Sequence, residues 1–143
     1  MIHGIDTSFL VALDAAGHPD NVWARSLLDE LLAAGDGLAL APQVLAEYVH
    51  VMTDPRRFEK PLAMAHARAR AEQWWNAKEV VGVFPRGHTV PTFFGWLQEH
   101  DLGRTRLLDT LLAATYLDND ISSVLTTTAR DFRVFARFRI LHP

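Results

Sequence analysis

The sequence has 143 residues, of which 49% are hydrophobic and 22% charged, as expected for a globular protein with a hydrophobic core. It contains no cysteine, which excludes disulfides and thiolate metal sites, so any metal ion must be bound by carboxylates or histidines. The formal net charge of −3 argues mildly against a nucleic-acid substrate, although it does not exclude a local basic rim.

Short apolar runs alternate along the chain with segments in which apolar residues recur at helical spacing. In chain order we expect a strand over 2–5, helices over 7–16 and 21–34, a strand over 38–41, helices over 42–53 and 61–77, a strand over 80–84, helices over 89–100 and 105–118, and strands over 121–126 and 137–141. This order predicts an α/β fold, with a central, mostly parallel sheet of four to five strands flanked by helices. We expect one domain over residues 1–143, with the consecutive helices 42–53 and 61–77 protruding beside the sheet.

Asp6 directly follows the first predicted strand and precedes an apolar helix. In open α/β sheets ligands bind outside the carboxyl ends of the strands, so a carboxylate at this position is well placed to build a site. Asp is also a good helix N-cap, and the local sequence alone does not distinguish the two roles.

Glu47 lies within an apolar helical segment and shares a face with the core-type residues Val44 and Tyr48. A carboxylate in such a place is costly to bury without a partner. Arg56 or Arg57 is a candidate partner, so a purely structural ion pair is the alternative to a functional role.

Asp109 poses the same question in a second apolar helix, where Leu108 precedes it and Leu112 lies one turn further on. Arg104 and Arg106 are near enough in sequence to pair with it. Either arginine would make Asp109 a structural residue.

A convergence of Asp6, Glu47 and Asp109 would disfavour their ionisation through mutual repulsion, and a divalent cation would neutralise all three together. Such a cation activates water and orients a phosphate. The residues therefore predict a carboxylate-lined metal site at the strand ends, of a kind that suits magnesium or manganese.

Four segments, taken in order, resemble the PIN-domain family, and within it the VapC-type toxin ribonucleases of type II toxin–antitoxin systems. They are Asp6-Thr7-Ser8, residues 42–47 (Pro-Gln-Val-Leu-Ala-Glu), residues 107–114 (Leu-Leu-Asp-Thr-Leu-Leu-Ala-Ala) and residues 125–132 (Leu-Thr-Thr-Thr-Ala-Arg-Asp-Phe). Their order and spacing cover essentially the whole chain. The resemblance implies a PIN-like three-layer fold.

The resemblance also implies a Mg²⁺- or Mn²⁺-dependent endoribonuclease, the toxin of a toxin–antitoxin pair, which hydrolyses RNA with metal-activated water and leaves 5′-phosphate and 3′-hydroxyl ends. By the family pattern, the catalytic and metal-binding acids are Asp6, Glu47, Asp109 and Asp131. The chain departs from the pattern at 128–129, where relatives often carry Asn or Asp and this sequence has Thr and Ala. A cap or turn before the next helix is the alternative role for Asp131.

Several polar residues next to these acids are candidate substrate contacts. Thr7 and Ser8 adjoin Asp6, where hydroxyls also commonly begin a helix, and Thr128 can hydrogen-bond to water or phosphate. Arg104 and Arg106 precede Asp109 and have the forked guanidinium that suits phosphate. An ion pair with a site acid or a solvated surface position is the alternative for both.

The family resemblance further implies an RNA substrate, a homodimer, and a cognate VapB-like antitoxin that places a basic side chain among the carboxylates. The sequence shows neither a signal-peptide pattern nor an apolar run near the roughly 20 residues that span a membrane, so we expect a cytoplasmic protein without membrane contact. No Ser-His-Asp pattern is visible. The alternatives are a catalytically inactive PIN-like module that binds RNA or protein, and a phosphohydrolase of small phosphates.

Overall fold

A computed structural model describes the whole chain, residues 1–143, and its centre is a five-stranded parallel sheet with the strand order β3-β2-β1-β4-β5. The strands are β1 (Ile2–Ile5), β2 (Gly37–Leu40), β3 (Val80–Gly82), β4 (Ser123–Leu125) and β5 (Arg139–Leu141). The expected α/β fold is confirmed, and every strand pair is parallel. The last strand lies at an edge of the sheet.

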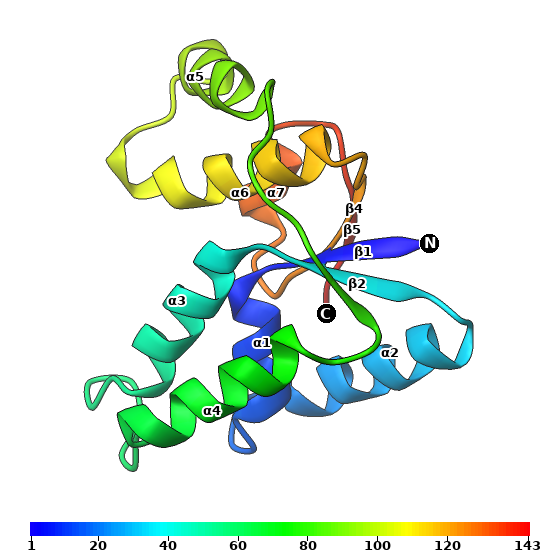
Figure 1. Cartoon of the computed structure of the whole chain (residues 1–143). Coiled ribbons are helices and arrows are strands. Elements are labelled where there is room, and N and C mark those ends of the chain that lie inside the picture. Colours follow the sequence, from blue (N-terminus) through cyan, green and yellow to red (C-terminus); the bar gives the residue numbers. More distant parts are fainter.

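Helices cover both faces of the sheet and give the molecule three layers (Figure 1). One face carries α1 (Thr7–Asp14), α2 (Asn21–Ala33), α3 (Pro42–Met52) and α4 (Met64–Trp75), and the other carries α5 (Thr89–Glu99), α6 (Leu107–Asp118) and α7 (Arg130–Arg133). A 3₁₀ turn over Arg104–Arg106 leads into α6. None of the helices combines the length and the apolar character needed to cross a bilayer.

The chain order creates a crevice between the neighbouring strands β1 and β4. The connection from β1 runs to β2 through α1 and α2, whereas the connection from β4 runs the opposite way to β5 through α7. Connections that diverge from adjacent parallel strands leave an opening at their carboxyl ends, which is where ligands bind in open α/β sheets. Asp6 and the turn over residues 126–129 follow these two strands directly.

The helices α3 and α4 were expected to protrude beside the sheet. They pack against each other, and α3 also packs on α1, so they belong to the layer that covers one face. From the end of β2, α3 continues past the carboxyl ends of the strands and forms one wall beside the β1–β4 opening (Figure 1). This placement carries Glu47 toward the end of β1.

Tyr116 anchors α6 to the sheet. Its ring is fully buried against Gly4, where an added Cβ would lie 2.7 Å from two ring carbons. Its hydroxyl donates a hydrogen bond to the backbone carbonyl of Ile5 on β1 and lies 3.3 Å from the carbonyl oxygen of Ala39 on the adjacent strand β2. Because Tyr116 follows Asp109 by about two helical turns, the packing of this ring also fixes the start of α6 relative to the strand ends.

Candidate active site

Asp6 occupies the N-cap position of α1 with an extended backbone, but its side chain makes no capping hydrogen bond to the helix. Its carboxylate instead accepts hydrogen bonds from the hydroxyls of Thr126, at 2.7 Å, and Ser8, at 2.8 Å. Both bonds end on the same oxygen, Oδ2. Hydroxyl groups, one of them from the turn after β4, therefore orient the side chain in place of a cap.

The environment of Asp6 disfavours its charged form. Burial raises the pKa of this carboxyl, and the nearby charge of Asp131 raises it further. The hydrogen bonds from Thr126 and Ser8 lower the pKa but do not cancel the effect of burial. No arginine, lysine or histidine pairs with Asp6 in the structure. A buried carboxylate that no cation balances favours the binding of a positively charged ligand.

Glu47 has no basic partner either. Arg56 and Arg57, the candidates expected from the sequence, pair with Asp54 at 3.3 and 3.7 Å. The Glu47 carboxylate accepts a hydrogen bond of 3.0 Å from the hydroxyl of Thr7. Burial raises the pKa of Glu47, and the charge of the neighbouring Asp6 adds to the rise.

Asp109 lies in the first turn of α6 and is the third acid of the cavity. Its pKa is raised to about 7, first by burial and then by the charges of Asp6 and Asp131. Arg106 opposes this rise, but its Nε lies 3.9 Å from the carboxylate, the long limit of an ion pair. One weak pairing does not balance the negative charge around Asp109.

These three acids line one cavity of about 420 Å³ at the carboxyl ends of β1 and β4. Its wall is made by α1, α3, the start of α6 and the turn after β4. The convergence of Asp6, Glu47 and Asp109 that was expected from the sequence is thus present. From Asp6 to Glu47 the chain advances 41 positions, and from Glu47 to Asp109 a further 62.

Asp131 does not line this cavity. It lies in the first turn of α7, and Arg106 binds it from two directions: Nη2 donates to its backbone carbonyl at 2.6 Å, and Nε lies 3.8 Å from its carboxylate. The Nε of Arg106 is buried and makes no hydrogen bond. Arg106 is therefore the ion-pair partner of acids at the site, whereas Arg104 is exposed.

No family model matches the sequence. The ribonuclease VapC31 of Mycobacterium tuberculosis is 28% identical over 148 aligned positions, which cover 97% of this chain and 96% of that protein. Among solved structures, VapC20 of Mycobacterium tuberculosis, described as a sarcin-ricin loop cleaving toxin, superposes with a TM-score of 0.73 at 22% identity, with all of both chains covered. A chain of the VapBC2 complex of Rickettsia felis superposes with a TM-score of 0.69 at 18% identity, covering 100% of this chain and 99% of that one.

The chain is thus similar to the VapC-type PIN-domain toxins. The similarity extends over almost the whole of both proteins in sequence and in fold, so it includes every element that builds the cavity. The resemblance stated from the four sequence segments is confirmed.

Two of the expected substrate-contact residues have defined positions. Thr7 donates its hydroxyl hydrogen to Glu47 and so orients an acid, while it also lines the cavity. Thr128 lines the cavity too, and its hydroxyl lies 3.5 Å from Asp6 and 3.1 Å from Thr126. Thr128, where the sequence departs from the family pattern, thus still faces the acids.

Sequence reasoning missed His18 and Arg57 as residues that line the carboxylate cavity. His18 belongs to the turn after α1, and Arg57 to the loop after α3. Neither lies in a motif or a periodic segment, so only the tertiary arrangement reveals them.

A Ser-His-Asp arrangement also went unrecognised in the sequence. The Nδ1 of His3 lies 2.7 Å from the hydroxyl of Ser123, and its Nε2 lies 3.0 Å from Asp36. His3 and Ser123 lie near the amino ends of β1 and β4, and Asp36 directly precedes β2. These residues are therefore at the opposite end of the strands from the carboxylate cavity. Because Ser123 and His3 are both buried, this chain of hydrogen bonds ties strands together and presents no nucleophile to a substrate.

The three acids of the cavity fit a divalent cation in chemical kind and in charge. Carboxylate oxygens are the ligands that magnesium and manganese prefer, and the raised pKa values of all three cavity acids reflect burial and negative charge that nearby basic side chains balance only in part. As the side chains stand, however, no three histidine or acidic groups lie close enough together to hold a metal ion.

Proposed function

We propose that this chain is a Mg²⁺- or Mn²⁺-dependent endoribonuclease and the toxin of a toxin–antitoxin pair. The observation that carries the proposal is the cavity in which Asp6, Glu47 and Asp109 meet without a matching cation. The relatives named as VapC ribonucleases support RNA as the substrate. A divalent cation, when bound, supplies Lewis-acid activation of water and neutralises the phosphodiester.

The side chains of the cavity have separable roles in this proposal. Asp6, Glu47 and Asp109 would hold the cation, with the hydroxyls of Thr126 and Ser8 fixing Oδ2 of Asp6 and leaving Oδ1 to face a ligand. Thr7 orients Glu47 in the same way. These supporting contacts matter because ligands that are already oriented lose less conformational freedom when they bind.

The cationic and hydroxyl groups at the edge of the cavity would contact the RNA. Arg104 is exposed at the start of the 3₁₀ turn before α6 and is free to bind a backbone phosphate. Thr128 can donate its hydroxyl to a phosphate oxygen at the cavity wall. Arg106 lies near the carboxylates of both Asp109 and Asp131. We propose that Asp131 completes the acidic set and that Arg106 limits the repulsion among these acids.

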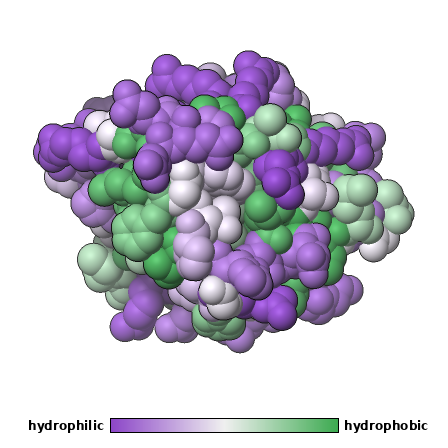
Figure 2. Space-filling view, turned by 90° about the horizontal axis from the view of Figure 1, so that it is seen from above, coloured by the Kyte–Doolittle hydropathy of each residue, from purple (hydrophilic) through white to green (hydrophobic).

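We further propose that a VapB-like antitoxin inhibits the chain by placing a basic side chain among the carboxylates, and that the chain forms a homodimer. The related structures of VapBC-1 and VapBC2 support an antitoxin partner. Exposed apolar side chains on α5 and α6, namely Val90, Phe94, Leu107 and Leu108, support burial by another chain. The view from that side shows apolar patches between polar residues (Figure 2).

The test is manganese-dependent cleavage of a mixed pool of tRNA and rRNA. The wild type is compared with Asp6→Asn and Asp109→Asn, and with Asp29→Asn on α2, outside the cavity, as the matched control. We expect discrete cuts by the wild type and the control, which EDTA abolishes and manganese restores, and no cuts by the two cavity variants. Folded wild type that neither cleaves RNA nor binds manganese in calorimetry would overturn the proposal in favour of an inactive binding module.

A further inference from the structure

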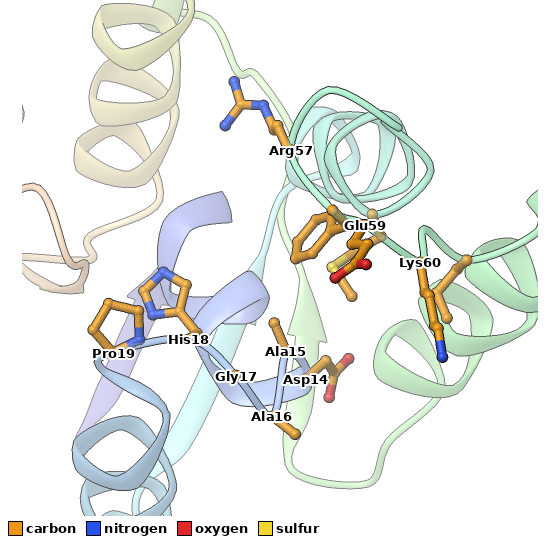
Figure 3. A pocket seen from close by; sticks show the side chains of 12 residues that line it. Asp14, Ala15, Ala16, Gly17, His18, Pro19, Arg57, Glu59 and Lys60 are labelled. Carbon is orange, nitrogen blue, oxygen red and sulfur yellow. The ribbon is translucent and has the colours of Figure 1, made fainter.

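A second cavity of about 470 Å³ adjoins the carboxylate cavity. It lies between the turn that follows α1, over residues 14–19, and the connection between α3 and α4, over residues 52–62 (Figure 3). His18 and Arg57 line both cavities, so they mark the junction. The two cavities therefore share part of their wall at these two residues.

The second cavity combines apolar and cationic groups. Met52 at the end of α3 supplies an apolar side chain, and Phe58 and Leu62 in the α3–α4 connection supply two more, of which Phe58 is an aromatic ring. Arg57 and Lys60 come from the same segment and are exposed. A base and a phosphate require this combination, since the base needs an apolar or aromatic surface and the phosphate a cation.

The negative groups of this cavity leave its cations available. Asp14 is already bound by Arg70, at 2.8 Å. Burial alone would raise the pKa of Asp14, but the hydrogen bonds from Arg70, Trp74 and Tyr48 together outweigh it and lower that pKa. Glu59 is exposed on the loop beside Lys60. The cavity is therefore not an acidic site, unlike its neighbour.

Arg57 is only loosely held. Its Nε lies 3.7 Å from Asp54, and 62% of its side chain is exposed to solvent. The terminal nitrogens of the guanidinium make no hydrogen bond within the chain, so its planar fork is free to bind a phosphate. In Figure 3 the guanidinium extends away from Lys60.

His18 presents a hydrogen-bond donor at the junction. Its Nδ1 accepts a hydrogen bond of 3.0 Å from the backbone N–H of Asp20, so the proton of the neutral ring must be on Nε2. The Nε2–H group has no partner within the chain. It can therefore donate to an oxygen of a strand that passes from one cavity to the other.

We propose that the second cavity binds one nucleotide of the RNA substrate next to the scissile phosphate. The base would pack on Phe58 and its apolar neighbours, Arg57 and Lys60 would contact the adjoining phosphates, and His18 would donate to the backbone at the junction. This inference rests on the proposed function, because it takes RNA as the ligand. In this proposal the α3–α4 connection helps to determine where the RNA is cut.

The experiment measures RNA affinity without cleavage, by fluorescence anisotropy of a labelled single-stranded oligoribonucleotide in EDTA. Gly17→Trp fills the cavity, since an added Cβ at Gly17 meets no atom within 4 Å and the backbone there is unstrained. Arg57→Ala removes the proposed phosphate contact. Arg68→Ala, an exposed arginine on α4 with the same change in charge, is the control, and melting curves establish that each variant is folded.

We expect Gly17→Trp and Arg57→Ala each to weaken binding about tenfold, the effect of losing one charge-assisted contact or one stacked base. Arg57→Ala should also reduce the slope of log Kd against log salt by about 0.7, the value for one phosphate of a single strand, and Arg68→Ala should change neither quantity. Unchanged affinity in the folded Gly17→Trp and Arg57→Ala variants would overturn the subsite even if the wild type cleaves RNA. Weakened affinity would support it even if cleavage is absent, so the two proposals fail separately.

Discussion

Replacing Asp109 with Asn should stabilise the metal-free protein. The pKa of Asp109 is raised from 3.8 to about 7, and each unit corresponds to about 1.4 kcal/mol of penalty on the charged form in the folded state. The full shift would be about 4 kcal/mol. Because 29% of the Asp109 side chain is exposed and solvent screens its charge, we expect about 2–4 kcal/mol. Asn has nearly the same shape without the charge.

The sign of the pH dependence follows from the raised pKa. Below about pH 4 the carboxyl is protonated in both the folded and the unfolded state, so its charge contributes no difference between the wild type and the Asp109→Asn variant there. As the pH rises from about 4 to about 7, the unfolded state releases its proton more readily and the wild type loses stability. The advantage of Asp109→Asn should therefore grow over this range and level off above about pH 7.

Thermal unfolding in EDTA at about pH 5 and about pH 8 tests this reasoning, with Asp29→Asn as the control for loss of an acid outside the cavity. We expect Asp109→Asn to raise the melting temperature at the higher pH by about 5–12 °C and by less at the lower pH. Manganese should stabilise the wild type more than the variant, because the variant lacks one ligand. An Asp109→Asn protein that is no more stable than the wild type at the higher pH would refute the idea that this charge is unbalanced.

Two further predictions concern the framework of the site. Gly4→Ala should cost about 1–3 kcal/mol in chemical denaturation, since its Cβ would meet the buried ring of Tyr116 at 2.7 Å, whereas Gly37→Ala has only ordinary contacts and serves as the control. Arg70→Ala should cost about 1–2 kcal/mol at neutral pH, less than a fully buried pair because 43% of the Arg70 side chain is exposed. Because the pKa of Asp14 is lowered in the folded state, the stabilisation is present above about pH 4, and the difference between wild type and Arg70→Ala should shrink as the pH falls below that. A constant difference across this range would argue against the ion pair as the cause.

The elements of the fold could be predicted from local chemistry. Pro42 begins α3, and the glycines around Asp36 separate α2 from β2, as the sequence indicates. The apolar runs of the parallel strands were recognisable because both faces of the sheet are covered by helices. The four-residue helix α7 was not predicted, since one turn is too short to show a helical period.

The candidate site was predictable only in part. Asp6, Glu47 and Asp109 stood out because each is an acid in an apolar setting, and all three line the cavity. What the sequence could not decide was which arginines would reach them. Arg57 was a candidate partner for Glu47 and instead pairs with Asp54, which is a matter of how the loop after α3 turns.

The contacts that sequence reasoning missed share one physical character: they join residues far apart in the chain and not part of a periodic pattern. His18 and Arg57 line the same two cavities, although 39 positions separate them. His3 reaches Ser123 across 120 positions. Such pairings depend on strand order and loop path, about which hydrophobic periodicity and local propensity carry no information.

The position of Arg106 explains how a chain with several acids around one cavity folds before any cation is bound. Three acids on one cavity repel one another, and the repulsion would be larger if Asp131 were also unpaired. Arg106 lies between Asp109 and Asp131 and its Nε approaches both carboxylates only to 3.8–3.9 Å, with that buried nitrogen left without a hydrogen bond. A tighter pair would stabilise the folded chain further but would compete with a metal ion for Asp109. The loose pairing is therefore a compromise, since it lowers the cost of assembling the acids while leaving most of their charge for a ligand.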